Sequence, residues 1–153
     1  MIYEQAITGK ETRFEKKAPQ AALQLFYQAF NTGDMEKMTA NWSHTEEASM
    51  SNPLGGVRRG WAEIAGVYER IFSGESEVYV EFYDYSIHQS GEFFCAVGRE
   101  RGYFINRGKK LDLAIRTSRV YRKQEGVWRQ LHHHGSIETP ALLEAYQANV
   151  VKK

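Results

Sequence analysis

The feature that most constrains the fold is a series of four long β-rich runs in the second half of the sequence. The runs cover about residues 78–88, 93–105, 111–122 and 127–136, and short connections that contain glycine separate them. Connections of this length and composition are typical of β-hairpins. The pattern therefore predicts four consecutive strands in an antiparallel meander, and strands this long should coil and curve the sheet.

The residues before these runs have a helical rather than a strand period. Pro19 suits the first turn of a helix that continues to about Phe30, a short second helix ends near Trp42, and a third covers Trp61 to Phe72. A short helix is also expected after Pro140. We divide the chain into a flexible N-terminal arm (1–16), a main α+β domain (17–137) and a C-terminal helix or tail (138–153).

Three helices followed by a four-stranded meander predict an α+β fold. One face of the sheet must bury its apolar side chains against the helices. We expect a cone-shaped, curved antiparallel sheet wrapped on about three N-terminal helices, with one internal pocket between the two layers. The other sheet face has no cover from this chain, so we expect a homodimer through that outer face.

The charge balance narrows the range of partners. The chain has 20 Lys and Arg against 19 Asp and Glu, a net charge of +1, which argues against nucleic acid or a membrane as partner. No segment resembles a signal peptide or a membrane span, so we expect a cytoplasmic protein. The single cysteine, Cys95, excludes an intrachain disulfide. We predict no cofactor.

Several segments resemble a known superfamily. The helical segments AALQLFYQAFNTGDMEKM and GWAEIAGVYERIF, the turn SNPLGG and the strand pair TSRVYRKQEGVWRQLHHHGS resemble nuclear transport factor 2-like proteins of the SnoaL-like (polyketide cyclase/ketosteroid isomerase-like) kind. The chain is also similar to the association domain of calcium/calmodulin-dependent protein kinase II. The resemblance covers about residues 18–137 and implies the cone-shaped fold. It implies no single chemistry, because the superfamily includes enzymes, transport factors and oligomerisation modules.

The resemblance also allows one enzyme branch to be tested residue by residue. Ketosteroid isomerases need a carboxylate base, together with a Tyr and a protonated Asp that stabilise the enolate. The position that matches the base is Asn52, the one that matches the Tyr is Phe26, and the Asp position falls near Ser118. An amide cannot accept the proton and a phenyl ring cannot donate one. We therefore expect no isomerisation by this route.

The run His132-His133-His134 offers candidate catalytic groups. On a strand, His132 and His134 point to one face and His133 points to the other. Two histidines on one face could bind a metal or serve as general acid and base. No Asp, Glu or Cys lies at ligand spacing beside them, so we predict no metal site. We take His134 and His132 as candidate catalytic residues.

Further candidates for ligand binding come from the strands and the turns. Arg119, and approximately Arg101, match pocket-lining arginines of the association domain, where converging guanidinium groups would hold a carboxylate. The alternative is that these arginines form surface ion pairs. Gly135 stands where the association-domain pattern has a further arginine. We place Trp42 at the pocket mouth, facing the turn at Asn52.

Three hypotheses for function follow. The first is a small-molecule-binding protein whose pocket takes an apolar ligand with a carboxylate or carbonyl group. Its predicted ligand-binding residues are Trp42, Asn52, Arg101, Arg119 and His134. The second is a lyase, isomerase or hydrolase with a pocket histidine as general acid–base. The third is a non-enzymatic dimerisation module.

Overall fold

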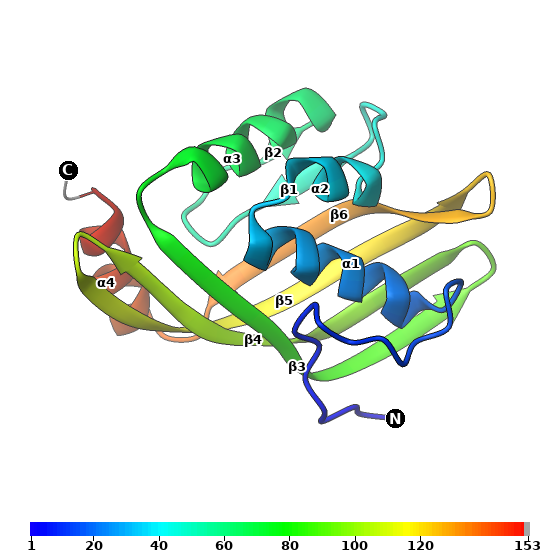
Figure 1. Cartoon of the computed structure of the whole chain (residues 1–153), viewed down its shortest axis with the longest axis horizontal. Helices are drawn as coiled ribbons and strands as arrows, with labels where there is room; N and C mark the ends of the chain where they lie inside the picture. Colours follow the sequence, from blue (N-terminus) through cyan, green and yellow to red (C-terminus); the bar gives the residue numbers. More distant parts are fainter. Residues whose placement is uncertain (152–153) are drawn as a thin grey trace.

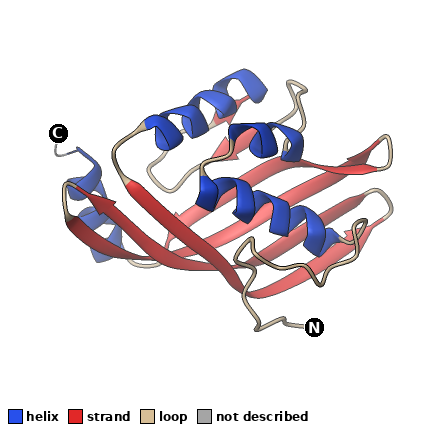
Figure 2. Ribbon diagram, viewed as in Figure 1, coloured by secondary structure: helices blue, strands red, loops and turns tan. Residues whose placement is uncertain are grey.

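The computed structural model describes residues 1–151 and shows helices packed on one face of a curved sheet (Figures 1 and 2). The sheet has the strand order β2-β1-β6-β5-β4-β3. Its four long strands are β3 (Glu77–Ser90), β4 (Phe93–Asn106), β5 (Lys109–Gln124) and β6 (Val127–Ile137), each antiparallel to the next. The predicted α+β fold and the meander are confirmed.

Two short strands at the edge make the sheet mixed rather than wholly antiparallel. β1 (Ser49–Ser51) pairs parallel to β6, and β2 (Arg58–Arg59) pairs antiparallel to β1. The parallel pairing aligns Ser49, Met50 and Ser51 with the three consecutive histidines of β6.

The three predicted helices begin and end at the expected signals. α1 (Pro19–Thr32) begins at its proline and ends at Gly33, which has a left-handed backbone. α2 (Met35–Asn41) is capped by Asp34, whose carboxylate accepts a hydrogen bond from the Lys37 amide, and α3 (Trp61–Ser73) follows β2. These helices cover the inner face of the sheet in Figure 1. The core between the layers is apolar and strongly aromatic.

The N-terminal segment differs from the flexible arm that the sequence led us to expect. Ile7 is fully buried and exchanges two backbone hydrogen bonds with Phe82 of β3, and Tyr3 does the same with Tyr85. At Gly9, which has φ +100°, a Cβ atom would lie 2.4 Å from the backbone nitrogen of Gln28. This apolar anchor and the close approach that glycine allows hold the segment against the domain.

The last helix, α4 (Pro140–Val151), lies at one end of the sheet (Figure 1). Tyr146 packs edge-to-face on Phe104 of β4, with ring centroids 5.3 Å apart. The Asn106 amide donates to the carbonyl of Asn149 at 2.8 Å, and the Asn149 side chain is buried. The helix expected after Pro140 is therefore part of the same packed unit as the sheet.

A β-bulge in β6 decides which side chains face the helices. Val120 pairs with His132 while Tyr121 pairs with Gln130, so Leu131 is an extra residue on β6. An extra residue reverses the alternation of the strand beyond it. Trp128 and Gln130 point inward before the bulge, and His133 points inward after it.

Two further findings concern the surface of the chain. Over residues 1–151, no helix combines the length and the hydropathy that crossing a membrane requires. The outer sheet face carries exposed residues such as Arg116 and His134. Pairing of that face with a second copy stays a prediction.

Candidate functional site

A cavity of about 410 Å³ lies between the sheet and the helices, within the size range of sites for small organic molecules. Most of its wall is apolar and comes from α1, α3, the long strands and α4. Leu54, Arg70 and Ile71 line the cavity and are also exposed, so its mouth lies between the turn after β1 and the end of α3. Apolar wall residues include Phe26, Phe30, Val80, Phe104, Leu113 and Ile115.

A buried ion pair forms the polar end of this cavity. Arg119 of β5 is 2% exposed, and its Nη2 lies 3.0 Å from Oε2 of Glu100 on β4. Tyr27 of α1 donates to the same oxygen at 2.5 Å and accepts from Arg119 Nε at 3.3 Å. Both Glu100 and Arg119 line the cavity. Side chains from α1, β4 and β5 thus form a buried network around the two opposite charges of Glu100 and Arg119, from which water is largely excluded.

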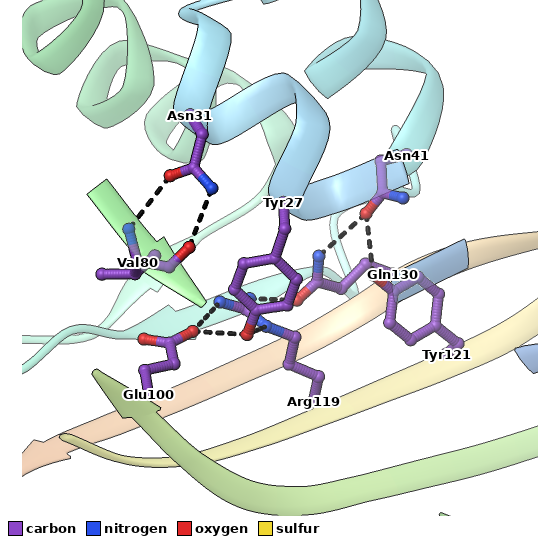
Figure 3. Close-up of polar contacts among 8 residues, drawn as sticks. All are labelled: Tyr27, Asn31, Asn41, Val80, Glu100, Arg119, Tyr121 and Gln130. Atoms are coloured by element: carbon purple, nitrogen blue, oxygen red, sulfur yellow. Dashed lines mark hydrogen bonds and ion pairs between the residues drawn. The ribbon is translucent and has the colours of Figure 1, made fainter. Parts of the chain in front are cut away.

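The ion pair continues into a chain of buried hydrogen bonds (Figure 3). Arg119 Nη1 donates to Gln130 Oε1 at 2.8 Å, and Gln130 Nε2 donates to Asn41 Oδ1 at 3.1 Å. Tyr121 donates to the same Asn41 oxygen at 2.9 Å, and Asn41 Nδ2 donates to the carbonyl of Ala22. The network fixes the position of the guanidinium group through α1, α2 and β6.

The surroundings of Arg119 keep it charged. Burial by itself disfavours the charged form, but interactions with Tyr27, Glu100 and further phenol oxygens outweigh burial and raise the pKa of Arg119 above its ordinary value. The guanidinium carbon also lies 3.6 Å from the ring centroid of Phe26, a cation–π contact. Phe26, which occupies the position of the isomerase Tyr, therefore covers the Arg119 guanidinium group with its ring instead of donating a hydrogen bond.

His133 is the second polar group of the cavity wall. It is 7% exposed and lines the cavity as the direct cross-strand partner of Arg119. Burial, together with the charge of Arg119, lowers the pKa of His133 well below its ordinary value. Its ring is therefore neutral at neutral pH. Nδ1 has no hydrogen-bond partner among the described residues, an uncommon state for a buried polar atom.

The structure corrects the predicted placement of His132 and His134. His134 is exposed on the outer sheet face, and half-buried His132 shares that face, with its Nδ1 2.7 Å from Ser49 Oγ. Neither residue lines the cavity. The expectation that these two histidines face the pocket is wrong because the bulge at Leu131 turns His133 inward in their place.

Arg101 also lies outside the cavity. Its side chain is 52% exposed, its Nε pairs with Glu81 at 2.9 Å, and its guanidinium carbon lies 4.0 Å from the ring centroid of Tyr83. Arg101 therefore forms a surface ion pair, the alternative left open from the sequence. Arg119 is the one of the two that lines the cavity.

Of two further predicted ligand-binding residues, one lies in the core and the other lines the cavity. Trp42 is fully buried in the core against Trp61 and Tyr68, not at the mouth, and its Nε1 has no partner in the described part of the chain. Asn52 does line the cavity, at its rim. Its Oδ1 accepts from the Leu54 amide at 3.1 Å and so shapes the turn.

Tyr27, Glu100 and His133 were missed as site residues from the sequence. For Glu100 a signal existed, because even-numbered β4 residues such as Phe94, Ala96 and Phe104 form the apolar face. Glu100 lies in phase with them, and the odd-numbered Arg101 does not. No comparable signal marks His133, because its orientation depends on a bulge that alternation alone does not reveal.

The family model of the SnoaL-like domain matches residues 20–140, most of the chain. The chain belongs to this SnoaL-like family. The matched range includes Asn52, Glu100, Arg119 and His133 of the cavity, and it ends at the first residue of α4. The family assignment and the architecture agree with the resemblance seen in the sequence.

Several solved structures share this fold. A calcium/calmodulin-dependent protein kinase type II association domain from Thiobacillus denitrificans is 23% identical, with TM-score 0.65, over 84% of this chain and all of that chain. A protein of the nuclear transport factor 2-like family from Streptomyces avermitilis is 21% identical, with TM-score 0.69, over 78% of this chain and 93% of that chain. At these identities the likeness shows the fold alone. None of the curated proteins matches the sequence.

The part of the chain that the structure describes contains no set of side chains that could bind a metal ion. Residues 1–151 contain no group of three or more His, Cys, Asp or Glu side chains arranged to hold a metal ion. The polar groups of the cavity include an ion pair, a neutral imidazole and amides, all of which can form hydrogen bonds with an organic ligand.

Proposed function

We propose that this SnoaL-like protein binds a small, mainly apolar molecule in its cavity and holds an oxygen-bearing head group of it, a carbonyl, carboxylate or hydroxyl, at the polar end. The observation that carries the proposal is the buried ring of His133, which lines an apolar cavity and whose Nδ1 has no hydrogen-bond partner among the described residues. A ligand that forms a hydrogen bond with His133 would compensate the cost of burying it.

Arg119 and Asn52 would complete the polar contacts. A guanidinium group has five N–H donors, and the hydrogen bonds of Arg119 to Tyr27, Gln130 and Glu100 use one each. Two N–H donors of Arg119 therefore remain that a ligand oxygen could use. Asn52 would contact a ligand at the rim, and Leu54 and Ile71 would cover its apolar end.

A second candidate function is catalysis with His133 as general base. A neutral imidazole at neutral pH can accept a proton, and the lowered pKa of His133 keeps it in this form. The hypothesis of a lyase, isomerase or hydrolase with a pocket histidine is therefore kept. The histidine that would act as general base is His133 instead of His132 or His134. Binding is the function that the geometry supports best.

A thermal-shift screen against apolar metabolites with carbonyl, carboxylate or hydroxyl groups tests the proposal. A ligand present at a hundred times its dissociation constant should stabilise the protein by about 2.7 kcal/mol. His133→Gln should weaken the response, whereas the matched control His134→Gln, on the outer face, should leave it unchanged. A response that is lost in His134→Gln but kept in His133→Gln would contradict the proposed site. No response to any compound would favour the dimerisation module.

A further inference from the structure

The polar end of the cavity carries no net charge. Glu100 and Arg119 form an ion pair, and both are almost fully buried. The one other lysine, arginine or carboxylate side chain of the described wall is Arg70, which is exposed at the mouth. Water and salt screen an exposed cation strongly. A ligand head that reaches the interior therefore meets a charge that is already neutralised.

Glu100 also has an oxygen available to a ligand. Tyr27 and Arg119 both donate to Oε2, and Oε1 accepts no hydrogen bond from any described residue. In Figure 3 the second oxygen of Glu100 points away from the network. A carboxylate oxygen only accepts hydrogen bonds, so its natural ligand partner is a donor such as a hydroxyl group.

A ligand with a carboxylate head would bind unfavourably beside Glu100 at the polar end of the cavity. It would lose its hydration on entering the cavity and would lie near the negative charge of Glu100. Arg119 could attract it only by weakening its own contacts with Glu100, whose charge would then be left without a partner. A hydroxyl group faces neither cost, and it can accept from Arg119 while it donates to Glu100.

We propose that the cavity selects an uncharged apolar ligand with a hydroxyl head, which donates to Glu100, over a ligand of the same shape with a carboxylate. This inference rests on the proposed function and specifies the chemical class of the ligand that the cavity binds. Glu100 is then a specificity-determining residue. It sets the charge of the cavity through its pair with Arg119 and offers an acceptor through its free oxygen.

The test uses naphthol and naphthoate, which share one apolar body, as probes in titration calorimetry of the full chain. Wild-type protein should bind naphthol at least about tenfold more tightly than naphthoate, as expected for one hydrogen bond to a charged group. Glu100→Gln should reverse this order, because it leaves the charge of Arg119 without a counter-ion. Arg70→Gln is the matched control and should keep the wild-type order.

Each outcome decides the question. Equal or tighter binding of naphthoate by wild-type protein would overturn this inference and leave the proposed function in place. Binding of neither probe would overturn both. An unchanged order in a folded Glu100→Gln variant would also overturn the inference. Should that variant fail to fold, the wild-type order decides by itself.

Discussion

Arg119 on β5 and His133 on β6 are direct cross-strand partners, and both side chains line the cavity. One is a cation held by Glu100 and the other is a neutral imidazole, because burial and the adjacent charge oppose its protonation. This pair places a fixed donor group beside a ring whose Nδ1 has no hydrogen-bond partner in residues 1–151. The predictions below follow from this arrangement and from the packing around it.

Removal of Arg119 should destabilise the fold much more than removal of Arg101. Arg119→Met leaves Glu100 buried without its counter-ion, which typically costs about 3–5 kcal/mol in the free energy of unfolding. Arg101→Met removes an exposed ion pair with Glu81 and should cost less than about 1 kcal/mol. Urea unfolding of the two variants measures the difference. Similar small losses in both would show that the buried pair does not support the fold.

A double variant tests the physical reason for this loss. When both charges are replaced by apolar side chains, no buried charge remains without a partner. Arg119→Met combined with Glu100→Leu should therefore regain part of the stability that Arg119→Met alone loses. If the double variant were less stable than either single variant, a buried charge without its partner would not be the cause of the loss.

The stability of the fold should depend on pH through His133. Its folded pKa lies well below the unfolded value of about 6.5, so the unfolded state binds more protons between these two values. Stability is then fully present above about pH 6.5 and is lost as the pH falls, by up to about 1.4 kcal/mol per pH unit. His133→Gln should flatten the dependence between about pH 7.5 and 5.5. An equally steep loss in that variant would contradict the assignment to His133.

The curved sheet should tolerate no side chain at position 102. A Cβ atom on Gly102 would lie 1.8 Å from the carbonyl oxygen of Tyr79, a backbone atom that cannot move independently. Gly102→Ala should cost at least about 2 kcal/mol, the range of a strained, overpacked site. The matched control is Gly66→Ala in the interior of α3, where the nearest atom is the flexible end of Arg70. That change should stabilise the protein by about 0.5–1 kcal/mol. Chemical unfolding that gives both variants the same stability would contradict this packing.

The wall that α4 contributes should slow ligand release. Tyr146 and Val150 line the cavity, and Tyr146 packs on Phe104. Tyr146→Ala should cost about 1–2 kcal/mol of stability through lost burial and aromatic contact. It should also raise the dissociation rate of naphthol in stopped-flow measurements. An unchanged dissociation rate would mean that the ligand leaves only past Leu54 and Ile71.

Much of the fold could be predicted because its signals are local. Pro19 and Gly33 mark the ends of α1, and glycine-bearing connections separate the four long strands. Arg119 was placed in the pocket, and it lies in phase with Leu113 and Ile115 on the inner face of β5. Such features need no knowledge of distant contacts.

The remainder of the site depends on contacts between distant parts of the chain. The direction of β1 is set by its pairing with β6, and the anchor at Ile7 depends on β3. The bulge at Leu131 turns His133 inward and His134 outward, and no local residue pattern predicts this bulge. Arg101 could have been placed correctly, because it lies out of phase with Phe94 and Ala96.

An NMR titration with naphthol tests the central claim most directly, since it reports which side chains sense the ligand. We expect saturable shifts of the Arg119 Nε–Hε signal and of the His133 ring signals, with no change at Arg101 Nε–Hε. Arg101, on the outer face, therefore serves as the internal control. Shifts at Arg101 and His134 while Arg119 and His133 stay unchanged would contradict it, because the ligand would then bind the outer face of the sheet.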